Sequence, residues 1–82
     1  MIGAKAVNHI GIAVRSIEAQ RGFYEDTLGA RFESIEEVPD QRVRVGFFLV
    51  GPAGAEVRLE LLEPTDDDSA IEAFIQRRGE GI

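Results

Sequence analysis

Three strand-like runs follow one another in this sequence with no helix between them. They cover residues 30–38, 43–51 and 55–63, and the turn-forming segments Pro39-Asp40-Gln41 and Gly51-Pro52-Ala53-Gly54 separate them. Connections this short join antiparallel neighbours, because a parallel crossover needs a dozen or more residues. The sequence therefore predicts that these runs form consecutive antiparallel hairpins.

A strand precedes the hairpins. Residues 6–14 alternate between a bulky face and a face of small residues around His9. The bulky face carries Ile10, Ile12 and Val14, and the small face carries Val7, Gly11 and Ala13 beside His9. Small residues around a single imidazole leave space in which another group can fit.

Two helices complete the predicted order. The first is expected over about 17–28, with Ser16 as N-cap and Gly29 as a left-handed C-cap, and with Ile17, Phe23 or Tyr24, and Leu28 at helical spacing. The second is expected over about 69–78, with a capping box of Ser69 and Glu72 and an end at Gly79. The fold class is thus α+β: residues 1–82 form one βαβββ module with a trailing helix.

Composition narrows the function classes. An 82-residue chain buries only about 60 to 65% of its unfolded surface, so its core alone is marginal. The sequence has no cysteine for a disulfide or a thiolate metal site, which leaves oligomerisation or a metal held by oxygen and nitrogen ligands. A net charge of -6 has the wrong sign for a nucleic-acid partner. No membrane span or signal peptide is recognisable, and a cytoplasmic location is expected.

Several segments together resemble the vicinal oxygen chelate superfamily, which includes the glyoxalases. These are Val7-Asn8-His9-Ile10-Gly11-Ile12-Ala13-Val14, Phe23-Tyr24-Glu25-Asp26-Thr27-Leu28-Gly29 and the βαβββ order. Leu59-Glu60-Leu61-Leu62-Glu63-Pro64 and Arg78-Gly79-Glu80-Gly81-Ile82 are similar to the methylmalonyl-CoA epimerase family within it. The resemblance covers nearly the whole chain.

The resemblance implies a metal site. Each module of that family gives two ligands, from its first and fourth strands, and these positions are His9 and Glu60. The implied cofactor is a divalent metal ion such as cobalt, manganese, nickel or zinc, and the implied substrate is a coenzyme A thioester, methylmalonyl-CoA. Strand alternation agrees, because Glu60 faces away from Leu59 and Leu61 as His9 faces away from Ile10. No acid or base is assignable from the sequence.

The resemblance also implies a partner for this module. Relatives carry two modules in tandem, so the chain is expected to be an N-terminal half, as a fragment or as a natural single module. Its partner is then a second βαβββ module or an identical chain in a homodimer. Other readings stay open: a glyoxalase-like lyase, a ring-cleaving dioxygenase, or a ligand-binding module of the same fold without catalysis.

Each candidate residue also has a simpler, structural interpretation. His9 alone suits a structural hydrogen bond, and Glu60 could pair with Arg58 two residues away. Phe23 and Tyr24 are expected in the helix core, and Gly46 is expected to leave room for a neighbouring side chain or a substrate. The remaining candidates are assigned to solvated surface: Glu33, Glu36 and Glu37 on a strand edge, Asp66 to Asp68 before the second helix, and Arg42 and Arg44, whose alternative is contact with coenzyme A phosphates.

Overall fold

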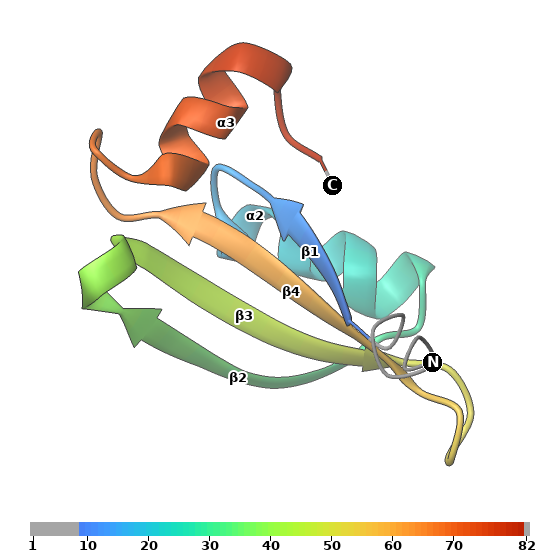
Figure 1. The fold of residues 1–82 in the computed structure, drawn as a ribbon. Coiled ribbons are helices and arrows are strands. Elements are labelled where there is room, and N and C mark those ends of the chain that lie inside the picture. The colour runs from blue at the N-terminus through green and yellow to red at the C-terminus, as the bar shows by residue number, and fades with distance from the viewer. Residues whose placement is uncertain (1–8, 82) are drawn as a thin grey trace, which may run out of the picture.

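A four-stranded sheet with helices on both faces forms the fold (Figure 1). The structure is a computed structural model and describes residues 9–81. In chain order the elements are β1 (His9–Ala13), α2 (Ile17–Gly22), the π-helical turn η1 (Phe23–Thr27), β2 (Arg31–Val38), the 3-10 turn η2 (Pro39–Gln41), β3 (Val43–Val50), β4 (Val57–Pro64) and α3 (Ala70–Arg78). The predicted α+β class and βαβββ order are confirmed. The part of the predicted first strand before His9 lies outside the described residues.

The strand order is β1-β4-β3-β2, so the first strand lies beside the last. The predicted hairpins are antiparallel, β2 with β3 and β3 with β4. In contrast, β1 runs parallel to β4 and places Gly11 opposite Glu60. The sheet therefore brings the two predicted ligand strands side by side.

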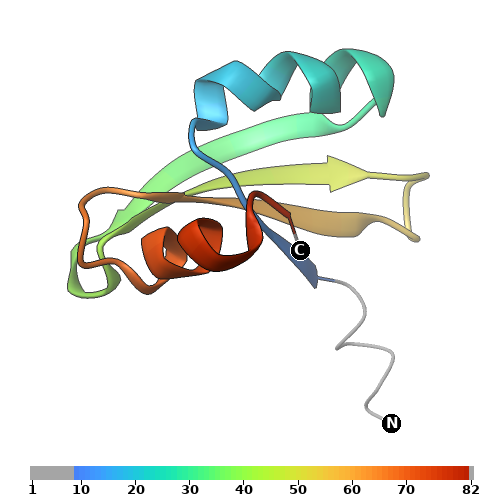
Figure 2. The ribbon, with the colours of Figure 1, turned by 90° about the horizontal axis from the view of Figure 1, so that it is seen from above.

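The hydrophobic core lies between the sheet and α2. Ile17, Phe48 and Leu61 are fully buried there, and Ile10 and Ile12 of β1 pack against the same cluster. Figure 2 shows α2 and α3 on opposite sides of the sheet. The predicted bulky face of β1 is thus the core face, and His9 and Glu60 lie on the other.

One side-chain assignment in the first helix is wrong. Tyr24 packs against the core as predicted, but Phe23 is 50% exposed and Leu28 is 46% exposed. The helix changes from α to π at Phe23, whose carbonyl accepts a hydrogen bond from the Leu28 N–H at 3.3 Å, five residues on. The wider turn shifts the angular spacing of the side chains, so the regular α-helical pattern fails after Gly22.

Gly46 leaves room for a neighbouring side chain. A Cβ atom at this position would lie 3.0 Å from Cγ2 of Ile17. The first of the two predicted reasons for this glycine is therefore confirmed, because close packing of α2 on β3 requires it.

The helix caps are those that the sequence predicts, with one difference. Ser16 accepts a hydrogen bond from the Ala19 N–H at 3.1 Å, and Gly29 has the expected positive φ of 69°. Ser69 accepts from the Ile71 N–H, but its own N–H donates to Asp66 O at 3.3 Å. The predicted capping box is therefore only half formed, since Glu72 is engaged elsewhere.

The engagement of Glu72 joins α3 to the end of β1. Its carboxylate accepts hydrogen bonds from the side chains of Arg15 and Gln76. These bonds lower the pKa of Glu72 below its ordinary value. Beyond α3, Gly81 pairs with Ala13 through two backbone hydrogen bonds of 2.7 and 3.0 Å. None of the helices between residues 9 and 81 is long and apolar enough to cross a membrane.

Candidate metal and substrate site

His9 and Glu60 lie together on the sheet face opposite the core. His9 Nδ1 is 3.2 Å from Glu60 Oε2, although the two residues are far apart in the sequence. The side chain of His9 is 55% exposed and that of Glu60 is 28% exposed. An imidazole and a carboxylate are thus adjacent and accessible to solvent at the junction of β1 and β4.

Neighbouring residues on this face shape the space around Glu60. Its register partners are Gly11 on β1 and Phe47 on β3. Gly11 has no side chain on the β1 side of Glu60, and Phe47 is an aromatic neighbour on the β3 side. Glu60 therefore has a glycine on one side and an aromatic residue on the other, and the predicted space among the small residues of β1 stays a prediction.

The alternative pairing of Glu60 with Arg58 is not formed. Arg58 instead lies 3.8 Å from Glu33 on β2, and its guanidinium stands 5.4 Å above the ring of Phe47. Glu60 therefore makes its contact with His9.

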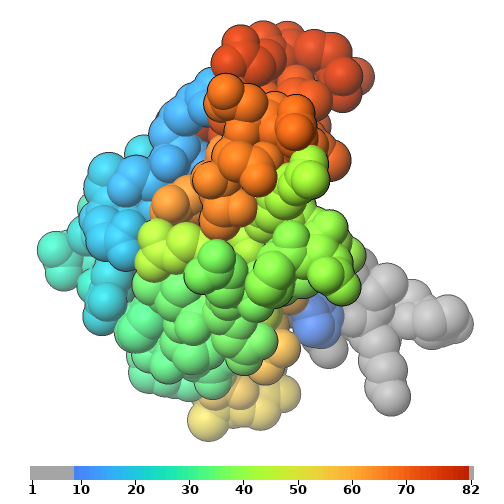
Figure 3. Space-filling view, turned by 90° about the vertical axis from the view of Figure 1, so that its left-hand side faces the viewer, coloured from blue at the N-terminus to red at the C-terminus, as the bar shows by residue number. Residues whose placement is uncertain are grey.

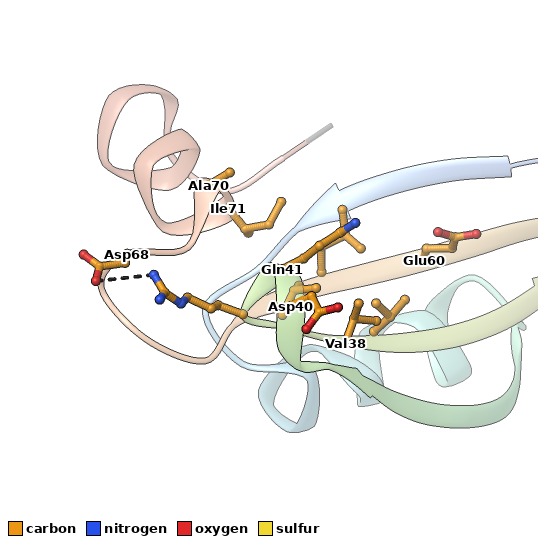
Figure 4. A pocket seen from close by; sticks show the side chains of 11 residues that line it. Val38, Asp40, Gln41, Glu60, Asp68, Ala70 and Ile71 are labelled. Carbon is orange, nitrogen blue, oxygen red and sulfur yellow. Dashed lines mark ion pairs between the residues drawn. The ribbon is translucent and has the colours of Figure 1, made fainter.

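A hollow of about 570 Å³ extends from Glu60 along the same face. Figure 4 shows Glu60 at one end, the η2 turn with Asp40 and Gln41 at the other, and Ile71 from the start of α3 above. Val45 and Leu62, which pair across β3 and β4, form part of its apolar lining. The hollow therefore joins polar groups at both ends with apolar side chains between.

Arg42 joins the η2 turn to the loop before α3, at the end of the hollow away from Glu60. Its guanidinium lies 3.5 Å from Asp66 Oδ2 and 3.4 Å from Asp68 Oδ2, and its carbonyl accepts a hydrogen bond of 2.9 Å from the Thr65 N–H. Figure 3 shows the green turn and the orange loop before α3 in contact at this end. Arg42 has a φ of 56°, the only positive φ at a non-glycine residue in the described part of the chain.

Arg44 is also paired, with one carboxylate on α2 and one on β4. It lies 3.2 Å from both Glu18 and Glu63, and these carboxylates raise its pKa. A backbone hydrogen bond, together with Arg44, lowers the pKa of Glu18. Both arginines considered for coenzyme A phosphates are thus neutralised by carboxylates of this chain.

The donor set at His9 and Glu60 suits a divalent metal ion in part. Imidazole nitrogen and carboxylate oxygen bind cobalt, manganese, nickel and zinc. Between residues 9 and 81, no group of three or more histidine, cysteine, aspartate and glutamate side chains is arranged to hold a metal. The described residues therefore bring together two donor side chains, fewer than the three that a metal centre usually takes from a protein.

Sequence reasoning missed the role of the η2 turn in this site. The turn pattern predicts only a hairpin role for Asp40 and Gln41, yet both line the hollow. The turn reaches the hollow because Arg42 holds it against the loop before α3, a long-range contact. The one local sign of this role in the sequence is that two polar residues, Asp40 and Gln41, stand in a turn where glycine is common.

This combination of a βαβββ order with a sheet in which β1 lies parallel to β4 defines a glyoxalase-type module. The sequence profile of the Glyoxalase/Bleomycin resistance protein/Dioxygenase superfamily matches residues 8–82. The chain belongs to that superfamily.

The similar proteins include methylmalonyl-CoA epimerases and an uncharacterised protein. The chain is 45% identical over 76 residues to the uncharacterised protein YqjC of Bacillus subtilis, covering 93% of this chain and 51% of YqjC. It is 35% identical to the mitochondrial methylmalonyl-CoA epimerase of Mus musculus, covering 92% of this chain and 40% of that protein. The crystal structure of methylmalonyl-CoA epimerase from Mycobacterium tuberculosis superposes with a TM-score of 0.82 at 34% identity, over 90% of this chain and 48% of that chain.

The homology thus includes methylmalonyl-CoA epimerases, as the sequence predicts. The chain spans about half the length of the relatives it matches.

Proposed function

We propose that this chain forms one half of the active site of a metal-dependent methylmalonyl-CoA epimerase. The observation that carries the proposal is the adjacency of His9 and Glu60 on the open sheet face, 3.2 Å apart. The moderate identity to several epimerases supports the substrate class. In this proposal a second module, or an identical chain, supplies the remaining ligands.

The reaction requires loss and return of the proton at the carbon between a thioester and a carboxylate. A bound divalent ion supplies Lewis-acid stabilisation of the enolate that this loss creates. His9 and Glu60 would hold that ion, with the neutral imidazole nitrogen and the ionised carboxylate as donors. Val45 and Leu62 would exclude water from the acyl group, and Phe47 would limit its position.

Asp40 is the best candidate in this chain for moving the proton. Three carboxylates line the hollow, but Glu60 is assigned to the metal and Asp68 lies against Arg42. No ion pair within residues 9–81 involves Asp40, which keeps its carboxylate available as a base. Inversion needs a second group on the opposite side of the carbon, and the partner module would supply it.

Exchange of the substrate α-proton with solvent tests the proposal. The full-length protein is incubated with (2R)-methylmalonyl-CoA and a divalent metal in deuterium oxide, and the label is followed by mass spectrometry. We expect deuterium incorporation with formation of the 2S epimer, and a fall in kcat of about 10² to 10⁴ in Asp40→Asn.

Other outcomes assign the remaining candidate functions. Metal-dependent binding of the thioester without any exchange would contradict the epimerase and support a non-catalytic binding module. Turnover of a glyoxalase-type hemithioacetal, without exchange on methylmalonyl-CoA, would support a lyase.

A further inference from the structure

A bulge in β2 puts an extra acidic side chain on the open face of the sheet. The register of β2 against β3 shifts between Phe32 and Ser34, so Glu33 is the inserted residue. Phe32 and Ile35 both pack against the core, although regular alternation would place residues at this odd spacing on opposite faces. A bulge redirects side chains in this way, and it leaves Glu33 on the face away from the core.

Glu33 reaches Arg58 of β4 across the strand between them. Figure 1 shows β3 between β2 and β4. The guanidinium of Arg58 lies 3.8 Å from a carboxylate oxygen of Glu33 and 5.4 Å from the centre of the Phe47 ring on β3. At 3.8 Å the contact between the two charged groups is an ion pair without a hydrogen bond. The Arg58 side chain therefore extends over β3, toward Glu33.

Arg58 is also close enough to interfere with the candidate metal ligands. It precedes Glu60 by two positions on the same face of β4, which is about 7 Å along the strand, and it is the register partner of His9. Rotation of Arg58 toward Glu60 would form an ion pair on the carboxylate that the metal needs. It would also bring a positive charge nearer to a divalent ion. In the structure Glu60 instead contacts His9 at 3.2 Å.

We infer that Glu33 is a positioning residue of the metal site, which holds Arg58 over Phe47 and so keeps Glu60 available to the ion. The inference rests on the proposed function, because it needs His9 and Glu60 to bind a divalent metal. Glu33 acts through Arg58 alone. Without the arginine, the Glu33 carboxylate has nothing to hold in place, and the ion loses a nearby repulsive charge.

A double-mutant cycle on metal affinity tests the inference. Cobalt(II) is titrated calorimetrically into the full-length protein as wild type, Glu33→Gln, Arg58→Met and the double variant. We expect Glu33→Gln to bind cobalt about three- to tenfold more weakly, and Arg58→Met to bind it about three- to tenfold more tightly. The double variant should bind as tightly as Arg58→Met. Methionine keeps an apolar side chain on Phe47, and thermal melts check that each variant is folded.

Glu25→Gln is the matched control. Glu25 also pairs with an arginine that stands over a phenylalanine ring, since Arg21 lies 3.1 Å from Glu25 and 3.8 Å from the centre of the Phe32 ring. This group lies on the α2 side of the sheet, away from His9 (Figure 2). The control should leave the cobalt affinity unchanged.

The remaining outcomes separate the inference from the proposed function. A loss from Glu33→Gln that persists in the double variant would show a direct effect of the charge of Glu33 and would overturn the inference. Unchanged binding in Glu33→Gln, or unchanged or weaker binding in Arg58→Met, would overturn it as well. In each of these cases the proposed function stands if binding depends on His9. If wild type binds no cobalt, or binds it equally well as His9→Ala, the proposed function fails and the inference fails with it.

Discussion

Glu60 and Leu61 are consecutive residues that face opposite sides of the sheet. Leu61 is fully buried in the core, whereas Glu60 contacts His9 on the open face. We expect Glu60→Ala to lower metal affinity by at least about tenfold with little change in stability. Leu61→Ala should lower the free energy of unfolding by about 2 to 4 kcal/mol and keep metal binding in the folded fraction. Urea unfolding and metal titration of both variants measure this. Unfolding of Glu60→Ala with unchanged metal binding would show that the two roles are reversed.

At the residue scale, strand alternation predicts which side chains of β1 and β4 face away from the core. It separates His9 from Ile10 and Glu60 from its neighbours, because the period of two holds along a regular strand. The same kind of reasoning failed for Phe23, since the π-helical turn departs from the α-helical period and no local signal in the sequence marks it. The metal role of His9 and Glu60 came from family resemblance and stays a prediction.

At the element scale, close packing of α2 on β3 depends on the absence of a side chain at Gly46. A Cβ at Gly46 would press on Ile17 at 3.0 Å, so Gly46→Ala should destabilise the protein by about 1 to 3 kcal/mol. Gly22 ends α2 with a helical φ of -59°, and a Cβ there meets nothing closer than 4.0 Å. Gly22→Ala should therefore stabilise by up to about 1 kcal/mol. Thermal melts of the pair check both signs. Equal effects would contradict the packing described between these elements.

One of the contacts that join α3 to the end of β1 uses the charge of Glu72. Its hydrogen bond from Arg15, and then that from Gln76, lowers its pKa below the ordinary value of 4.5. A lowered pKa in the folded state means a stability contribution that is present above pH 4.5 and is lost as the pH falls through the folded value. Glu72→Gln should thus melt below wild type at pH 7, and the difference should shrink below pH 4.5. A difference that is constant with pH would show that the charge contributes nothing.

Elements and their ends were largely predictable, but the hollow between them was not. Turn residues, caps and alternation are local signals, and they located the strands and helices within a few residues. The hollow depends on Arg42 joining the η2 turn to the loop before α3, a contact between distant segments. Side-chain pairing of this kind has no periodic signature, so the sequence predicts only a turn role for Asp40 and Gln41.

At the scale of the whole molecule, the open face and the marginal core both favour a partner. A small domain that forms half a cup is expected to expose the apolar surface on which a second module would pack, and therefore to associate. We predict that the 82-residue chain forms a dimer or a larger assembly. Sedimentation velocity at micromolar concentration measures this, and a stable folded monomer under those conditions would contradict the prediction.

A true twofold axis between identical chains would bring together His9 and Glu60 from each and complete a site of two imidazoles and two carboxylates. Calorimetric titration of a divalent metal into the 82-residue chain tests this most directly, with His9→Ala beside the wild type. The account predicts about one metal ion per two chains, with binding lost in His9→Ala. One metal ion per chain, or binding that does not depend on His9, would contradict it.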